Sequence, residues 1–176
     1  MLGWFRKRNR ARASAVQLYG SSVAQARAET FYASWRVPDT DEGRYEVISL
    51  HLCLLALRLQ LEGEEGGELA RLLFETFMTD LDDNMREQGV SDLKVPGHVR
   101  KAATGLYDRF GAYRQALLAS DNAALEQALE VQFATLDANA DSRAIAAYMR
   151  DSDRLLASQP AELLYAGVLR FPLLPG

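Results

Sequence analysis

Residues 47–61, with the sequence VISLHLCLLALRLQL, constrain the fold of this chain more than any other stretch. In a helix over about residues 43–61, apolar side chains occupy nearly every face, and such a helix has to be covered on all sides. The stretch includes His51, Arg58 and Gln60 and falls short of the roughly 18–20 apolar residues that cross a membrane. We therefore expect a largely buried central helix in a bundle and no membrane-spanning segment.

The rest of the 176 residues reads as further helices, with no run of alternating apolar and polar residues that would indicate a strand. This length suits one domain with a single core. We expect an all-α, single-domain bundle of six or seven helices. Besides the central one, helices are predicted at about 12–35 (with Gly20 as a candidate break), at 68–88 and 96–118, after caps at Ser120 or Asp121 and at Asp141, and briefly after Pro160.

Two polar stretches are predicted to connect these helices. Residues 36–44 form a turn in which Asp39, Thr40 and Asp41 are candidate helix caps. Arg44 is placed to pair with Asp39 or Asp41, which would hold this turn. Residues 62–67, EGEEGG, are polar and glycine-rich, so we expect an exposed connector.

Positive charge is concentrated at the start of the chain. The first twelve residues carry a charge of +5 and the whole chain −4, so the remainder carries −9. A basic arm on an acidic body is typical of a chain that meets a lipid surface or RNA, whereas a solvated terminus is the alternative interpretation. We expect residues 1–12 to be a flexible basic arm and residues 13–176 the helical domain. Candidate contacts of the arm with a membrane or polyanion are Trp4, Phe5, Arg6, Lys7, Arg8, Arg10 and Arg12.

Residues 78–96, MTDLDDNMREQGVSDLKVP, are rich in carboxylates. They do not form an EF-hand loop, because Met85 stands where that loop needs glycine, and no acid follows Asp83 at the spacing of an aspartate-rich diphosphate-binding motif. Helical geometry instead places Phe74, Phe77, Leu81 and Met85 on one face and Asp80, Asp83 and Glu87 on the opposite one. Gly89 is predicted to end this helix as a left-handed cap. The acids are therefore interpreted as an outward face that is either solvated or docks a basic partner.

No pattern of a catalytic centre is present in the sequence. His51 lies inside the apolar helix and is interpreted as a core residue with one hydrogen bond, while His98 is expected to be exposed. The single cysteine, Cys53, is interpreted as a small buried apolar residue. No Glu-x-x-His, phosphate-binding loop or nucleophile elbow occurs. We expect no enzymatic activity, no cofactor and no metal. The alternatives are an all-α metal- or diphosphate-dependent enzyme that uses the Asp80–Asp83 cluster, and a generic membrane-surface helical adaptor.

Four stretches resemble the ubiquinol–cytochrome c chaperone family, the bacterial relatives of the mitochondrial factor for assembly of the cytochrome bc1 complex. They are LYGSSVAQAR…FY (18–32), VPDTDEGRYEVISLHLCLLALRL (37–59), LFETFMTDLDDNMREQGVSDLKVP (73–96) and LLYAGVLRFPLLP (163–175). The resemblance implies an all-α, non-enzymatic chaperone that binds newly made cytochrome b, or another subunit of the bc1 complex, during assembly of complex III. It further implies a cytoplasmic protein, peripheral to the inner face of the cytoplasmic membrane, with a ribosome or a small partner protein as candidate partners. DNA is not expected as a partner.

Such a chaperone needs an apolar or amphipathic surface for a membrane-protein segment and a charged surface for its loops. We expect the aromatic residues ahead of the Pro38 turn to be exposed for binding, with a core role as the alternative. The candidate partner-binding residues are Phe31, Tyr32, Trp35, Asp39, Arg44, Asp80, Asp83, Glu87, Val90, Asp92 and Leu93.

Overall fold

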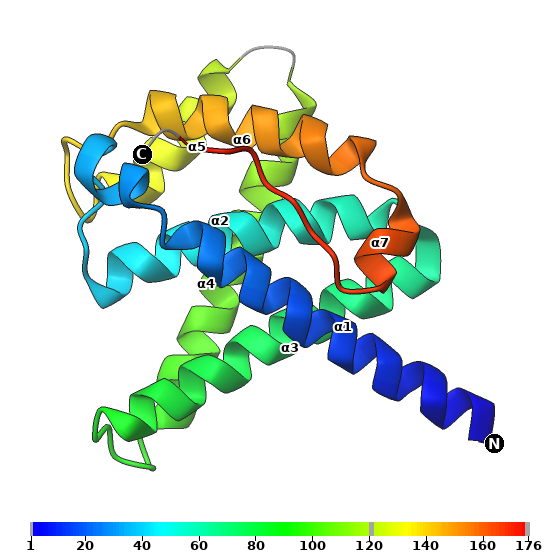
Figure 1. The fold of residues 1–176 in the computed structure, drawn as a ribbon. Helices are drawn as coiled ribbons and strands as arrows, with labels where there is room; N and C mark the ends of the chain where they lie inside the picture. Colours follow the sequence, from blue (N-terminus) through cyan, green and yellow to red (C-terminus); the bar gives the residue numbers. More distant parts are fainter. Residues whose placement is uncertain (1, 120–121, 175–176) are drawn as a thin grey trace.

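The computed structural model describes residues 2–119 and 122–174, and for residues 2–6 the backbone alone (Figure 1). Within these ranges the chain forms seven α-helices, one short π-helix and no strand, which confirms the all-α bundle. The elements are α1 (Leu2–Ala26), η1 (Thr30–Ser34), α2 (Asp41–Gln60), α3 (Gly63–Glu87), α4 (Val95–Leu118), α5 (Ala123–Phe133), α6 (Ser142–Ser158) and α7 (Ala161–Tyr165).

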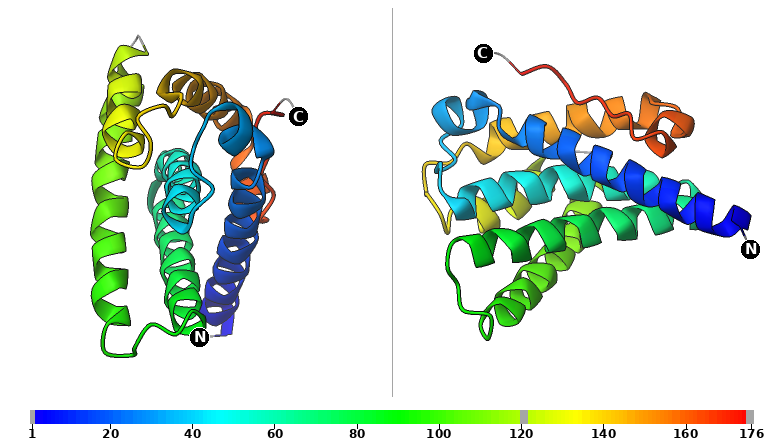
Figure 2. Two further views of the ribbon diagram at one scale, coloured as in Figure 1. Left: turned by 90° about the vertical axis from the view of Figure 1, so that its left-hand side faces the viewer. Right: turned by 60° about the horizontal axis from the view of Figure 1, so that its bottom comes forward.

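Helix α2 lies at the centre of the bundle, as its sequence predicts. It packs against α1, α3, α4, α5 and α6, and Leu50, Leu52 and Leu54 have no exposed surface. Because successive residues of a helix point about 100° apart, this burial requires neighbours on every side. Figure 2 shows how this is achieved, with α1 and α4 on opposite sides of α2 and α3.

The first predicted helix is wrong in its bounds. Helix α1 begins at Leu2 rather than near Arg12, and it runs through Gly20 without a break. The chain turns instead at Arg27 and Ala28, and the π-helix η1 follows. Residues 2–12, expected as a separate arm, form the first turns of α1. The start of this helix extends beyond the neighbouring helices (Figure 1), whereas Lys7 already pairs with Glu65 of α3. The division of the chain at residue 12 stays a prediction.

The connector predicted at residues 62–67 is also wrong, because α3 already begins at Gly63. The cause is the close approach of α2 and α3. Gly63 has a positive φ of 72°, and a side chain on Gly66 would start 2.0 Å from the backbone oxygen of Leu59. These glycines therefore let the two helices follow each other directly, and Gly66 is buried rather than exposed.

The predicted helix ends are mostly confirmed. Gly89 has a positive φ of 81°, and the amides of Gly89 and Val90 donate to the carbonyls of Arg86 and Met85, the bonds of a Schellman ending. The side chains of Thr40 and Asp141 accept from backbone amides at the starts of α2 and α6. The predicted caps Ser120 and Asp121 lie outside the described residues.

The chain ends in an extended strap over residues 167–174, which runs back over the bundle (Figure 1). Gln159 holds the strap through two hydrogen bonds with the backbone of Arg170, each 2.9 Å long. The ring of Phe171 meets that of His51 edge-on, with centroids 4.8 Å apart. The strap therefore covers part of α2 that the helices leave open.

Candidate functional site

A groove of about 270 Å³ between α1, α2 and α3 is the candidate functional site. It brings together Tyr32, Arg44 and Asp80, three residues predicted to bind a partner. Its apolar lining comes from all three helices and from η1. The lining residues are Tyr19, Val23, Ala26, Arg27, Tyr32, Asp41, Arg44, Tyr45, Ile48, Phe77, Asp80, Leu81, Asn84, Met85 and Gln88.

Aromatic rings form one wall of this α1–α2–α3 groove. Phe77 stacks on Tyr45 with centroids 5.6 Å apart, and the ring of Tyr19 lies 5.9 Å from Phe77. Phe77 and Tyr19 are largely buried, so the accessible part of the wall comes from Tyr45 and Tyr32. The hydroxyls of Tyr45 and Tyr32 donate to the carbonyls of Ala102 and Ala26, each over 2.7 Å. Since each phenol has its partner within the protein, the rings can offer apolar surface without an unsatisfied polar group.

Charges of both signs lie at the rim of the groove. Arg27 and Arg44 contribute positive charge, and Asp41 and Asp80 contribute negative charge. Arg44 donates to Asp39 over 2.7 Å, as the sequence predicts, and this hydrogen bond lowers the pKa of the Asp39 carboxyl. The rim therefore suits a segment that carries both charged and apolar residues.

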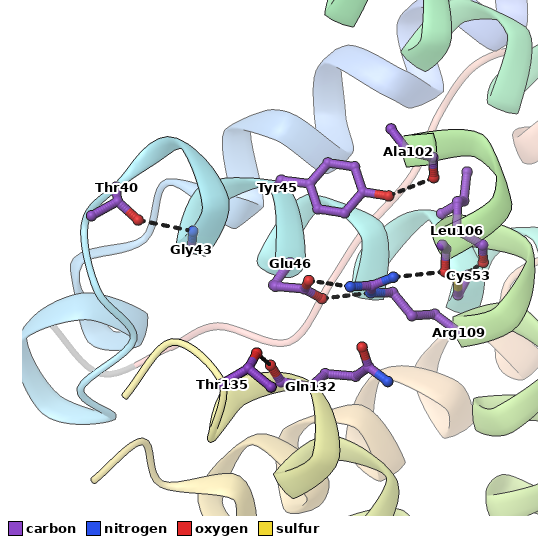
Figure 3. Close-up of polar contacts among 11 residues, drawn as sticks. Thr40, Gly43, Tyr45, Glu46, Cys53, Ala102, Leu106, Arg109, Gln132 and Thr135 are labelled. Atoms are coloured by element: carbon purple, nitrogen blue, oxygen red, sulfur yellow. Dashed lines mark hydrogen bonds and ion pairs between the residues drawn. The ribbon is translucent and has the colours of Figure 1, made fainter. Parts of the chain in front are cut away.

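A buried ion pair fixes the back of the groove to α4 (Figure 3). Glu46 accepts from both Arg109 Nε and Nη2, and Arg109 Nη1 donates to the carbonyl of Gly105 over 2.7 Å. The side chains of Arg109 and Glu46 are only 14% and 7% exposed. The guanidinium also lies 5.4 Å from the ring centroid of Tyr45. The orientation of Tyr45, and with it the aromatic wall, is thereby set by α4.

The aromatic residues before Pro38 are not the exposed group that we expected. Phe31 has no exposed surface and packs in the core against Trp35 and Tyr148. Trp35 is half-buried, and only Tyr32 reaches the groove. Both residues lie in the π-helical turn, where Phe31 is buried and the hydroxyl of Tyr32 donates to Ala26 at the end of α1.

The acidic residues separate into two groups. Asp80 is exposed, as predicted, but it also accepts the hydroxyl of Tyr19 over 2.6 Å at the contact of α1 and α3. Burial raises the pKa of Tyr19, and Asp80 raises it further, so this phenol remains a donor. Asp83 and Glu87 are exposed, as predicted, on the same side of α3 as Asp80.

The turn between α3 and α4 presents the remaining candidates. Arg86 pairs with Asp82, as the sequence predicts, and also with Asp92. Leu93 is 93% exposed, while Val90 is half-buried behind the Gly89 cap. This turn lies next to the α1–α2–α3 groove along α3, because Asn84, Met85 and Gln88 line the groove directly before it.

The basic residues of α1 lie beside acids rather than apart from the body. Lys7 pairs with Glu65 at 3.4 Å, and a hollow between α1 and α3 is lined by Arg8, Glu64 and Glu68 as well. The hydrogen bond from Arg71 lowers the pKa of Glu68, and Arg8 and Arg12 add to this effect. Arg10 is exposed. Trp4, Phe5 and Arg6 have side chains outside the described part of the structure.

His51 and Cys53, whose side chains are of types that take part in catalysis, both lie in the core. His51 is fully buried between the carbonyl of Val47 and the hydroxyl of Tyr148, each 2.7 Å away, and burial lowers its pKa to about 4. Cys53 is also fully buried, and burial raises the pKa of its thiol. His98 is exposed, as expected. Among the described residues, no group of three or more His, Cys, Asp or Glu is placed to hold a metal ion.

Tyr19, Tyr45, Ile48 and Phe77 are groove residues that were not predicted from the sequence. Each lies on a helix face that packing patterns assign to the core. The only signal available was the phenol of Tyr19 and Tyr45, since a buried tyrosine needs a partner for its hydroxyl.

None of the helices in the described ranges has the length and apolar character to cross a membrane.

The fold and the groove thus define a small, all-helical protein with a surface groove of mixed apolar and charged lining. The chain belongs to the ubiquinol–cytochrome c chaperone family, whose pattern matches residues 33–171. This confirms the resemblance seen in the sequence.

Known proteins similar to this chain fit the assignment. The crystal structure of the Cbp3 homolog from Brucella abortus matches 97% of this chain and 96% of that one, with a TM-score of 0.83 and 35% sequence identity. Ubiquinol-cytochrome c reductase complex assembly factor 1 is 24% identical over 109 residues in Mus musculus and 22% identical over 109 residues in Homo sapiens. These alignments cover 62% of this chain but only 37% and 36% of the relatives. The matched part thus spans little more than a third of their length.

Proposed function

We propose that this protein is an assembly chaperone for the cytochrome bc1 complex and acts by binding newly made cytochrome b, not by catalysis. Its family and the names of its relatives support the role in assembly. The observation that carries the binding proposal is the α1–α2–α3 groove, where an aromatic wall and a rim of mixed charge meet on one surface.

The groove can hold a membrane-protein segment in two ways. Its apolar wall covers side chains of the client that would otherwise be exposed to water before insertion. Each Å² of apolar surface removed from water contributes roughly 25 cal/mol to the free energy of binding. The rim charges, among them Arg27 and Asp41, pair with the polar ends of such a segment. Because Arg109 and Glu46 hold the wall in place, little ordering is required when the client binds.

The acidic turn between α3 and α4 is proposed as an extension of this surface. Asp83 and Glu87 near the end of α3 are exposed, as is Leu93 of the turn, so a basic loop of the client can dock beside the groove. Asp80 and Asp82 are instead engaged with Tyr19 and Arg86. These contacts do not favour the alternative of an enzyme that uses Asp80–Asp83 as ligands.

We further propose contact with the inner face of the cytoplasmic membrane through the first turns of α1, where Arg10 is exposed. Anionic lipids attract such basic segments by about 1 kcal/mol for each Lys or Arg near the surface. A cytoplasmic, peripheral location and additional contacts with a ribosome or a small partner protein stay predictions.

Site-specific photocrosslinking tests the proposed client and its site. A photoreactive residue in place of Met85, within the groove, is expected to capture cytochrome b in cells. The same residue in place of Val131, which is 62% exposed on α5, serves as a matched control and is expected to capture none. Equal capture at both positions, or capture of membrane proteins without preference for cytochrome b, would instead favour a generic adaptor. Asp83→Lys, which reverses one exposed charge, is expected to weaken capture if the acidic turn takes part.

A further inference from the structure

A second groove lies between α3 and α4, separate from the α1–α2–α3 groove. Its volume is about 620 Å³, and its apolar floor includes Phe74, Met78, Val99, Ala103 and Tyr107. Helices α4 and α1 lie on opposite sides of α2 and α3 (Figure 2). A molecule bound in the α3–α4 groove would therefore leave the α1–α2–α3 groove accessible.

The floor of the α3–α4 groove is an ordered aromatic cluster in which Phe74 is only 7% exposed and Tyr107 is the exposed member. Phe74 meets Tyr107 and Phe110 edge-on, with centroids 5.6 and 6.0 Å away. Tyr107 is nonetheless 58% exposed. Leu118, which is 81% exposed, follows three turns later and within about 20° of Tyr107 around α4. Arg114 lies between Tyr107 and Leu118 on the same side of α4, so this face combines exposed apolar side chains with positive charge.

The two edges of this groove differ in charge. On the α3 edge, Arg71 pairs with Glu68 and Glu75, and Arg86 pairs with Asp82 and Asp92, so acids outnumber bases. On α4, Arg100 and Arg114 lie beyond the groove lining, in line with Tyr107 along the helix. Both are exposed, and neither forms an ion pair in the described part of the chain.

The positions of Arg100 and Arg114 give the basic edge a definite length. They lie 14 residues apart in sequence, which is about 21 Å along a helix and within about 40° around it. They flank Tyr107 on the same side of α4. An acidic edge of matching length on a second helix would pair with both arginines while its apolar face covered Tyr107.

We infer that the α3–α4 groove is a docking site for an amphipathic helix of a partner protein. The helix packs its apolar stripe on Phe74 and Tyr107. It carries acidic side chains about four turns apart on the edge that faces α4, and basic or neutral side chains on the edge that faces α3. This site is independent of the client groove, so the protein can hold a client and a partner at the same time.

Two synthetic 18-residue helical peptides with the same leucine stripe test the proposal by fluorescence anisotropy. One has glutamates along one edge and lysines along the other, and the second has lysines along both edges. The full-length protein is expected to bind the first about tenfold more tightly, because two rim ion pairs are gained. The double variant Arg100→Glu/Arg114→Glu is expected to reverse this preference. Tyr107→Glu is expected to lose binding of both peptides.

Matched controls distinguish peptide binding at this site from a general effect of net charge and from binding in the client groove. Lys101→Glu/Arg143→Glu changes the net charge equally through exposed residues outside the groove lining and is expected to keep the original preference. Met85→Glu, in the client groove, is expected to leave peptide binding unchanged. Failure of the wild-type protein to bind either peptide, or a preference that Arg100→Glu/Arg114→Glu does not alter, would overturn the inference. A dimer of the wild-type protein in analytical ultracentrifugation that dissociates in the Tyr107→Glu variant would assign the α3–α4 groove to a second copy of the chain. That result would also overturn the inference.

Discussion

His51 shows how one buried side chain joins three parts of this molecule. A carbonyl can only accept, so Nδ1 of His51 carries the proton donated to Val47, and Nε2 accepts the hydroxyl of Tyr148 on α6. The ring is also enclosed by Phe31 of η1 and Phe171 of the strap. The neutral imidazole thus forms hydrogen bonds with α2 and α6, and its ring packs against η1 and the strap.

This environment makes stability depend on pH. Burial lowers the pKa of His51 from 6.5 to about 4, so between these values the unfolded chain binds a proton that the folded chain does not. The contribution of His51 to the free energy of unfolding is therefore fully present above about pH 6.5. As the pH falls from there toward 4, the free energy of unfolding decreases by up to about 3 kcal/mol. Urea unfolding at several pH values is expected to show a weaker acid dependence for His51→Gln than for the wild type. The matched variant of exposed His98, His98→Gln, is expected to retain the wild-type dependence, and an unchanged slope in His51→Gln would contradict this account.

The ion pair between Glu46 and Arg109 is a second residue-scale test, because it is buried and links α2 to α4. Removing one partner leaves the other charge in the interior, so Glu46→Leu or Arg109→Met is expected to lower the free energy of unfolding by about 3–5 kcal/mol. The double variant is expected to lose less than the sum of the two. Urea denaturation measures all three. Asp151→Ala, which breaks an exposed pair with Arg154, is expected to cost less than about 1 kcal/mol. Strict additivity of the Glu46 and Arg109 variants would argue against a coupled pair.

At the scale of elements, two glycines of the α3–α4 hairpin have opposite roles. Gly89 ends α3 in the left-handed region with a φ of 81°, whereas Gly111 lies inside α4, and a side chain at either position would meet no atom within 4 Å. Gly89→Ala is therefore expected to destabilise the protein by about 1 kcal/mol through backbone strain alone. Gly111→Ala is expected to stabilise it by about 0.5–1 kcal/mol. Thermal unfolding followed by circular dichroism compares the two, and a stabilising Gly89→Ala would contradict the assigned helix ending.

Helices with strong local signals were predictable from the sequence. The apolar run of α2, the glycine after α3 and the aspartate before α6 each act within a few residues, and each was predicted correctly. The failures come from contacts between segments far apart in sequence. Gly66 is predicted as a connector residue because the approach of α2 is not visible in the sequence. The hydrogen bond from Tyr19 of α1 to the exposed Asp80 likewise has no local signal. Phe31 needs a π-helical turn, which has no sequence pattern of its own.

At the scale of the whole molecule, the sequence placed only part of the candidate site. Tyr32, Arg44 and Asp80 were predicted as separate candidates, and the packing of α1, α2 and α3 brings them to one groove. The aromatic wall of Tyr45 and Phe77 depends on helix packing and on the support of α4. Family membership supports the proposal that the chain takes part in assembly of the bc1 complex, and the role of this groove in that process is part of the proposal.

The central claim is that the protein supports bc1 assembly by holding cytochrome b in the α1–α2–α3 groove. The most direct measurement is the haem b absorbance of membranes from a strain that lacks the gene and carries a plasmid copy. We predict that the absorbance is lost in the deletion strain and restored by the wild type and by Val131→Glu, but not by Met85→Glu at equal protein level. Normal haem b absorbance in the deletion strain would contradict the role in assembly, and full rescue by Met85→Glu would contradict the role of the groove.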